Sequence, residues 1–350
     1  MPDILFPYTN VDLTEEVNRI PNRFGLVNAL NLAPVDPLSS RYVRLDFRDG
    51  ELVVLAANEP GSPGQTSEPE QEQGTILMIP HFPHVETIRT GDLANGIQVV
   101  GGQMRARDLE TETARRLNTI RGHHSVTLEY IRMGMLRGLI KDGRGRTLYD
   151  LFNVFGITKK QVDFKLGTPG TNVREKCEEM VDHVMQNVKG ETVSQVEVIV
   201  SSGFFERLIS HANVEKFWQM EQHGGGSLMK LERERLGGNW GRVFDFGDIL
   251  WREYKGSFPV RDASGNKVQE PAVAAGKGHA YPAGTMNMFK TFAGPAHHIN
   301  LVNQAPGVDD PVFISTKVLD HGEGVEMKSQ SNRLAVCKQP ECLVEVLSSD

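Results

Sequence analysis

Residues 104–140 carry the clearest hydrophobic pattern of the chain. Positions suited to a buried face recur there every three or four residues, which is the period of an α-helix. They are Leu109, Thr113, Leu117, Ile120, His124, Leu128, Ile131, Met135 and Leu139. A continuous helix over this stretch would be about 55 Å long, more than the ~30 Å width of a small domain. The pattern therefore predicts a long helix whose two ends a compact globule cannot cover alone.

A predicted β-hairpin and an arm precede this helix. Apolar and polar residues alternate over 41–47, and 51–57 is a second, mostly apolar strand-like run, with Asp49-Gly50 as a tight turn between them. Residues 58–74 contain no large apolar side chain and are predicted to form a solvated loop. Residues 1–40 contain five prolines and only a weak helical signal, which predicts an extended arm. Neither segment has a core of its own, so each needs another surface to lie on.

The rest of the chain predicts a small α/β module followed by a β-rich return. Residues 147–155 and 161–166 are predicted to pair as strands. A helix over 172–188, a buried strand over 196–200 and a helix over 203–217 then follow, in an order typical of a sheet covered by helices.

Composition narrows the class of protein. Of the 350 residues, 39% are hydrophobic, which is typical of a globular chain. No run approaches the roughly 20 apolar residues that cross a bilayer, and the N-terminus lacks the pattern of a secretory signal. Three cysteines make an odd, sparse set, which favours a reducing compartment over a disulfide scaffold. The chain is therefore predicted to be soluble and made inside the cell.

Charge is distributed unevenly along the chain. The net charge of −7 argues against a dedicated nucleic-acid binder, which needs a concentrated basic surface. Residues 1–103 carry a net charge of −8, whereas residues 104–146 carry +5. This asymmetry predicts complementary contacts, within a subunit or between copies. The candidate contact residues are Glu51, Glu59, Glu68, Glu70 and Glu72 in the hairpin, and Arg105, Arg107, Arg115 and Arg116 near the helix.

Catalytic and metal-binding patterns are weak. The chain contains no phosphate-binding G-x-x-x-x-G-K-[ST] run, no G-x-S-x-G elbow and no H-E-x-x-H motif. Pro83 keeps His81 and His84 from sharing a helix face, and adjacent histidines such as His123-His124 point apart in regular structure. Glu68, Glu70 and Glu72 lie among prolines and glutamines, which favours a solvated loop over a cation site. No catalytic residue, cofactor or metal is therefore predicted.

The order of these elements resembles the tailed-phage major capsid fold, and more closely the lambda-type major capsid protein E family. The resemblance is carried by residues 43–57, 121–157, 198–217 and 331–347, and it spans nearly the whole chain. It implies an α+β chain with the HK97-like capsid fold. The implied parts are an N-terminal arm (1–40), an extended hairpin (41–90), a peripheral domain (91–168 and 299–350) with a spine helix (104–140), and an axial domain (169–298).

The resemblance also implies a function. Members of this family assemble as hexamers and pentamers into an icosahedral head that encloses double-stranded DNA without reading its sequence. It implies a virion protein assembled in the host cytoplasm, with no membrane, enzymatic activity or cofactor. A separate scaffolding protein and a portal are the expected partners, and a decoration protein is a further candidate.

Two alternatives remain open at this point. The first keeps the fold but encloses protein cargo in an encapsulin-like compartment. The second is a metal-dependent enzyme that uses His81, His84 and other residues. Within the capsid interpretation, the acidic hairpin of one copy is expected to lie over the basic helix region of the next.

Overall fold

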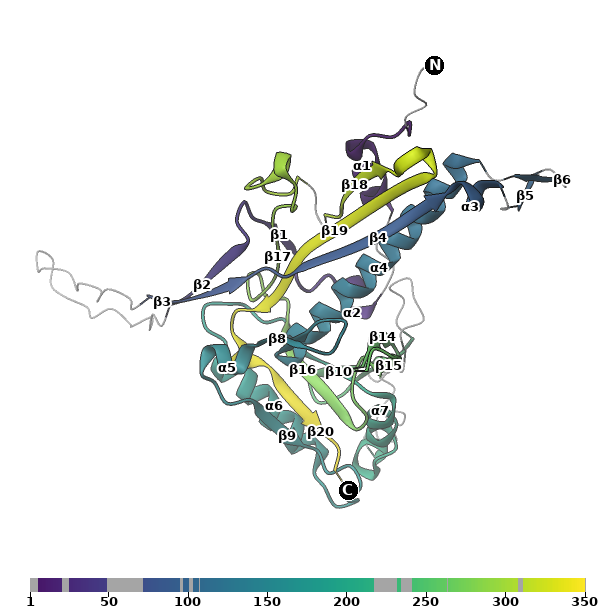
Figure 1. Ribbon diagram of the computed structural model, residues 1–350. Helices are drawn as coiled ribbons and strands as arrows, with labels where there is room; N and C mark the ends of the chain where they lie inside the picture. The colour runs from purple at the N-terminus through teal and green to yellow at the C-terminus, as the bar shows by residue number, and fades with distance from the viewer. Residues whose placement is uncertain are drawn as a thin grey trace, which may run out of the picture.

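A computed structural model of the chain describes residues 6–20, 25–48, 72–94, 97–100, 103–106, 108–216, 232–233, 241–262, 264–307 and 311–349. Its longest element is helix α4 (Leu109–Arg137), which runs diagonally through the molecule (Figure 1). Within the described residues, no helix combines the length and apolar character needed to span a membrane. The fold is α+β, with two main sheets arranged around α4.

Helix α4 confirms the predicted buried face but is shorter than the predicted 104–140. Asp108 caps its start by accepting a hydrogen bond from the Thr111 amide at 2.7 Å. Gly138 ends it in the left-handed conformation at φ 73°, where a Cβ atom would collide with the Phe152 ring. The predicted helix therefore loses its first residues to strand β6 and its last to strand β7.

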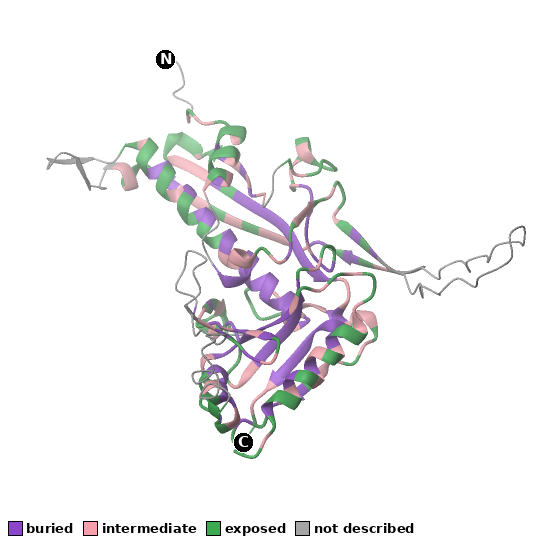
Figure 2. Ribbon diagram, turned by 180° about the vertical axis from the view of Figure 1, so that it is seen from behind, coloured by how far each residue is buried: buried purple, intermediate pink, exposed green. Residues whose placement is uncertain are grey.

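Burial along α4 changes from one end to the other. Its first half has an exposed face and a buried face, whereas Leu128 to Leu136 is buried all round (Figure 2). The N-terminal half thus lies at the molecular surface, and the C-terminal half forms the centre of the largest apolar core.

A five-stranded sheet packs along α4. Strand β19 is its centre, pairing with β4 and β18 over its first part and with β17 over its last part. Figure 1 shows β4 and β19 running beside the helix, consistent with the many residue contacts that β19 makes with α4. The strands are β1 (Val35–Pro37), β4 (His81–Arg89), β17 (Phe289–Ala293), β18 (Phe313–Val318) and β19 (Gly324–Cys337).

A seven-stranded sheet forms the second part of the molecule. Alternate residues of its central strand, Val196, Val198 and Val200, face helices α6 (Val173–Asn187) and α7 (Ser202–Ile209). Ile199 and Tyr281 face the core around the end of α4. In order, the strands are β11 (Glu232–Arg233), β12 (Arg242–Asp245), β13 (Ile249–Glu253), β10 (Gln195–Val200), β16 (Lys277–Ala283), β20 (Val344–Leu347) and β9 (Lys160–Asp163).

Four two-stranded ribbons and several short helices complete the described chain. The ribbons pair β2 (Tyr42–Arg48) with β3 (Glu72–Met78), β5 (Ile97–Val100) with β6 (Gln103–Ala106), β7 (Leu139–Lys141) with β8 (Thr147–Asp150), and β14 (Ser257–Arg261) with β15 (Lys267–Pro271). The short helices are α1 (Asn10–Arg19), α2 (Leu26–Leu30), α3 (Thr90–Ala94), α5 (Leu151–Phe155), η1 (Ile299–Leu301), η2 (Asp320–Gly322) and η3 (Pro340–Cys342).

The arm differs from the predicted extended segment. Over its described residues it forms α1, α2 and β1, and Leu13 and Val17 of α1 are buried. Asn18 bonds both the amide and the carbonyl of Val312, which seats α1 against the residue before β18. Proline prevents regular hydrogen bonding only locally, so the short elements between prolines still dock on the chain's own core.

Strand pairing adds to the prediction at one place and differs from it at another. Strand β2 pairs with β3, whereas the predicted Asp49-Gly50 turn and its second strand, 51–57, lie outside the described residues. Residues 151–155 form a helix, and the strands on either side of it join different sheets. Local alternation predicts a strand but does not identify the strand that pairs with it.

Sheet membership crosses the predicted domain limits. Strands β9 and β20, predicted in the peripheral part, belong to the seven-stranded sheet, and β17, predicted in the axial part, belongs to the five-stranded sheet. The chain therefore passes between the two sheets more often than the limits at residues 169 and 298 imply.

Candidate functional site

A charged cluster covers the exposed N-terminal half of α4. Glu112 has a fully buried side chain, and it accepts hydrogen bonds from Arg115 and, at 2.9 Å, from Arg116. The hydrogen bond from Arg115 has the largest influence on the pKa of Glu112. Together with the hydrogen bond from Arg116 it outweighs desolvation, and the pKa is lowered to about 2. Arg116 also bonds Glu86 of β4 at 2.8 Å and Asp92 of α3 at 3.3 Å. The cluster therefore joins three elements of one subunit.

The predicted contact residues fall into two groups. Arg116 is only 20% exposed and is occupied by three carboxylates of its own chain, whereas the Arg115 side chain is 50% exposed. Of the predicted residues, Arg105 lies on β6, and Glu72 lies on β3 opposite Arg48 of β2 in register. The remaining candidates lie outside the described residues, namely Glu51, Glu59, Glu68, Glu70 and Arg107.

A cluster of possible metal ligands lies beside these charges. His84 and Glu86 are two residues apart on β4, so their side chains share one face of the strand, and this face meets His123 of α4. The Nε2 atom of His84 lies 3.1 Å from Oε1 of Glu86, and the His84 and His123 rings are 4.6 Å apart. Burial, and then the neighbouring His84, lower the pKa of His123. Sequence spacing did not reveal this cluster, because its members come from two separate elements.

The other predicted histidines do not join it. His81 bonds Asn332 at 2.7 Å, so His81 and His84 do not form one site. His124 is buried between the hydroxyls of Ser331 and Ser329, at 2.9 and 3.1 Å. The prediction that neighbouring histidines point apart is thus confirmed for His123 and His124.

Below this surface, α4 is tied to the arm and to the seven-stranded sheet. The buried carboxylate of Glu129 accepts hydrogen bonds from the Val27 and Asn28 amides at 2.9 and 2.7 Å, and from the Tyr254 hydroxyl at 3.0 Å. Burial dominates over these bonds and raises the pKa of Glu129 to about 7. One turn further, Arg132 donates to the Ala33 carbonyl at 2.8 Å. The arm is thus held by polar contacts to the centre of the helix.

The β2–β3 ribbon presents an apolar face to solvent. Its inward side chains, such as Leu77, are buried, but Tyr42, Ile76 and Met78 are 61%, 66% and 47% exposed. Tyr42 and Met78 are directly opposite in register, and Ile76 lies two residues along the same strand, so the three share one face. The ribbon extends from one side of the molecule (Figure 1). Arg44, opposite Ile76 in register, is an exposed charged residue on the same face, and an exposed surface of several apolar side chains beside a charge is typical of an interaction surface.

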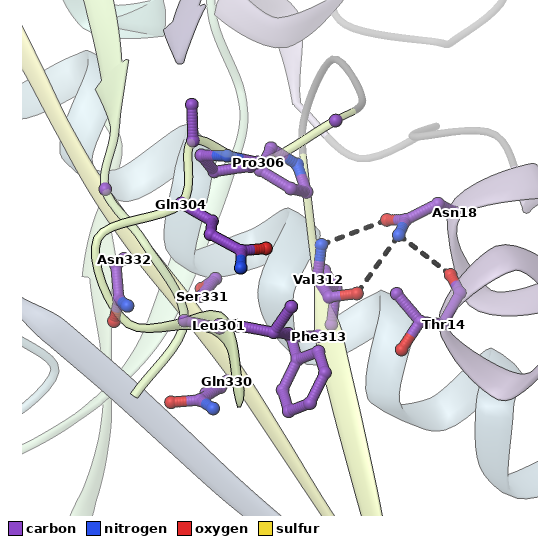
Figure 3. A pocket seen from close by; sticks show the side chains of 15 residues that line it. Thr14, Asn18, Leu301, Gln304, Pro306, Val312, Phe313, Gln330, Ser331 and Asn332 are labelled. Carbon is purple, nitrogen blue, oxygen red and sulfur yellow. Dashed lines mark hydrogen bonds between the residues drawn. The ribbon is translucent and has the colours of Figure 1, made fainter. Parts of the chain in front are cut away.

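A small cavity lies between α1, the 301–307 loop and strands β18 and β19 (Figure 3). Its volume is about 150 Å³. On its wall, Asn18 is already bonded to the backbone of Val312, and the Thr14 hydroxyl accepts a hydrogen bond from the Ile314 amide. Among its described lining residues, none carries a carboxylate, imidazole, amine or thiol. Thr14 and Ser331 contribute hydroxyls to its wall, but none of the described lining residues offers the general acid or base that would activate them.

Other potentially reactive groups are also poorly suited to catalysis. The pair formed by Ser331 and His124 resembles a nucleophile and its base, but burial and then the Arg333 charge hold the pKa of His124 far below its ordinary value. The three cysteines are buried free thiols, and burial raises the pKa values of Cys177 and Cys342 to about 12. A protonated, buried thiol is a poor nucleophile.

Comparison with known proteins identifies the family to which the chain is similar. Residues 9–348 match the family Phage major capsid protein E. The major capsid protein of Pseudomonas phage KPP10 is 31% identical over 97% of this chain and 96% of its own length. That of Salmonella phage Felix O1 is 28% identical over 96% of this chain and 95% of its own length.

A solved structure agrees at the level of the fold. A crystal structure described as that of a prophage capsid protein from E. coli CFT073 superimposes with a TM-score of 0.61 at 13% identity, covering 98% of this chain and 99% of that one. The fold is therefore the HK97-like capsid fold. The chain belongs to the phage major capsid protein E family, and it is a structural component of a phage virion.

Proposed function

We propose that copies of this chain assemble as hexamers and pentamers into an icosahedral head that encloses double-stranded DNA. The observation that carries the proposal is the exposed apolar face of Tyr42, Ile76 and Met78, on a ribbon that extends away from both main sheets. A second copy of the chain is the partner that a self-assembling shell supplies. Contacts that repeat head to tail from one copy to the next close into rings when the rotation between copies permits.

The parts of the subunit take different roles in this proposal. The five-stranded sheet and α4 form the peripheral part of each capsomer, and the seven-stranded sheet forms the axial part at its centre. The chain has a structural role without catalysis and is assembled in the host cytoplasm, with a separate scaffolding protein and a portal. The head encloses DNA by its shape, since a net charge of −7 disfavours tight phosphate binding to the chain.

The proposed charge pairing between copies needs revision in one respect. Reversing Arg116 would place a carboxylate beside Glu86, Asp92 and Glu112 of the same chain, so this change would disturb folding as well as assembly. Arg115 is half exposed and remains available to an acidic hairpin of another copy. The discriminating variant is therefore Arg115→Gln, because a change at Arg116 would disturb the subunit's own contacts as well.

The main experiment is expression of the full chain with and without its scaffolding protein, followed by electron microscopy. Closed shells with five-fold and six-fold capsomers are the expected result. A chain that stays monomeric at every concentration, with the scaffold present, would contradict the proposal. Particles that enclose protein in place of DNA in infected cells would instead support the encapsulin-like alternative.

A substitution on the ribbon tests the apolar face itself. Ile76→Lys adds a charge at a position that is 66% exposed, so we expect the free energy of unfolding of the subunit to change by less than about 0.5 kcal/mol. The yield of shells should fall at least tenfold, because the charge would be buried without a partner at the contact. Ile76→Leu keeps the apolar surface and serves as the matched control. Normal shells from Ile76→Lys would exclude this face from assembly.

A further inference from the structure

We propose that His84, Glu86 and His123 bind a divalent cation of the zinc class where strand β4 meets helix α4. Each residue offers one ligand atom, and these three atoms all lie within 4.8 Å of one another. The inference concerns the subunit and goes beyond its role in a shell.

The two supporting elements are rigid and meet face to face. His84 and Glu86 occupy alternate positions of a strand that pairs with β19 along its whole length, and His123 lies on a 29-residue helix. Ligands on regular elements hold their geometry better than ligands on loops. The site is therefore formed by the packing of the subunit, without rearrangement of the backbone.

The donor set and spacing suit zinc. Two imidazoles and one carboxylate are a common protein ligand set for Zn²⁺, with a water as the fourth ligand. Metal–ligand bonds of about 2.0 Å in a tetrahedron place neighbouring ligand atoms about 3.3 Å apart. The His84 and Glu86 atoms already have this spacing, at 3.1 Å. His123 is exposed, so its side chain is free to close the remaining gap and to leave a position for water.

Neighbouring groups orient the ligands. Arg116 binds Oε2 of Glu86 at 2.8 Å, so that the other oxygen, Oε1, points to His84. The positive charge of Arg116 is balanced by Glu112 and Asp92, which also contact it. The Ser329 hydroxyl donates to the backbone carbonyl of His84 at 3.0 Å. Outer contacts of this kind are what fix the ligands of protein metal sites.

A simple ion pair does not explain the third residue. The centroids of the His84 and His123 rings lie only 4.6 Å apart, so His123 faces the His84–Glu86 pair without completing it. A bound cation gives all three side chains the same partner. It would also join β4 to α4 at the surface end of the helix.

The test is a titration of the chelator-treated, full-length subunit with ZnCl₂, followed by calorimetry, and with CoCl₂, followed by visible absorption. We expect one ion per chain and the absorption bands of tetrahedral Co²⁺. His123→Gln and His84→Gln should each weaken binding at least tenfold, and Zn²⁺ should raise the melting temperature of the native chain but not of His123→Gln. The control is His321→Asn, at an exposed position outside the cluster where φ is 58°, which asparagine tolerates.

The outcome is decisive in either direction. No uptake by the native chain, or uptake that both ligand variants retain with unchanged affinity, would overturn the proposal. His123 is exposed, so His123→Gln remains informative even if His84→Gln fails to fold. The measurement uses the dissociated subunit, so its result does not depend on whether shells form.

Discussion

The two sides of the molecule are stabilised by different interactions. Between the seven-stranded sheet and helices α6 and α7, the core is apolar and aromatic: Trp251 stacks on Phe204 and meets Phe164 edge-on. Around α4, the helix buries charged and polar side chains, among them Glu112, Glu129 and Arg132.

The two sides therefore depend on their surroundings in different ways. Burial of the apolar core is favourable without specifically placed partner groups, because burial of apolar area is non-directional. The buried charges of α4 are favourable only while each partner stays in place, since an unpaired buried charge is costly. Helix α4 is thus the element whose neighbours (the arm, α3, β4 and the loop holding Tyr254) are specified one by one.

The largest expected effect is on the apolar side. Trp251→Ala should lower the free energy of unfolding by about 3–5 kcal/mol, because it leaves a cavity among fully buried rings and removes a hydrogen bond to the Phe246 carbonyl. Chemical denaturation of the subunit measures this loss. Val268→Ala, at a position that is 45% exposed, is the control and should cost less than about 0.5 kcal/mol. Equal losses in the free energy of unfolding for Trp251→Ala and Val268→Ala would contradict the expected importance of the buried rings.

The next effect concerns pH at the buried centre of α4. The pKa of Glu129 is raised from 4.5 to about 7, so the folded chain binds this proton more tightly than the unfolded chain. The stability from protonated Glu129 is therefore full below about pH 4.5 and is lost as the pH rises through 7, by up to about 3 kcal/mol.

Denaturation of the native chain and of Glu129→Gln between pH 4.5 and 8 isolates this contribution. We expect the slope of stability against pH to be more negative in the native chain, because the glutamine side chain of the variant does not titrate. Parallel slopes would show that Glu129 is ionised in the folded chain throughout this range.

The smallest effect compares the two arginines beside Glu112. Arg116→Gln should cost about 1–3 kcal/mol, since three carboxylates lose a charged partner and Glu112 is fully buried. Arg115→Gln should cost at most about 1 kcal/mol, because its side chain is half exposed and Arg116 still binds Glu112. Thermal unfolding of the two variants at neutral pH gives the difference. A larger loss of stability in Arg115→Gln than in Arg116→Gln would show that Arg115, and not Arg116, is the main partner of the buried carboxylate.

Much of the secondary structure was predictable. The spacing of Leu117, Ile120 and Leu128 identified the long helix, and all three are buried. The strand at 196–200 and the helix at 172–188 were also predicted, and their bounds agree within a residue. Periodicity reports which face of an element avoids water, and that property is local to the element.

The candidate site was less predictable. Charge alone grouped Arg115 and Arg116 and left contacts within a subunit and between copies both open, whereas the structure shows Arg116 bound to carboxylates from two other elements of its own chain. Glu86 was not singled out, because a lone glutamate on a strand has no distinctive spacing. Its meeting with His123 depends on how β4 crosses α4.

The amino-acid pattern was enough to identify the long amphipathic helix, the lack of catalytic motifs and the resemblance to a capsid family. Packing of the whole chain was needed to show that the arm docks on its own subunit, that β2 pairs with β3, and that His84, Glu86 and His123 converge. The physical reason is that hydrophobic period and turn residues act over a few positions, whereas strand partners and ion pairs depend on the burial available across the whole chain.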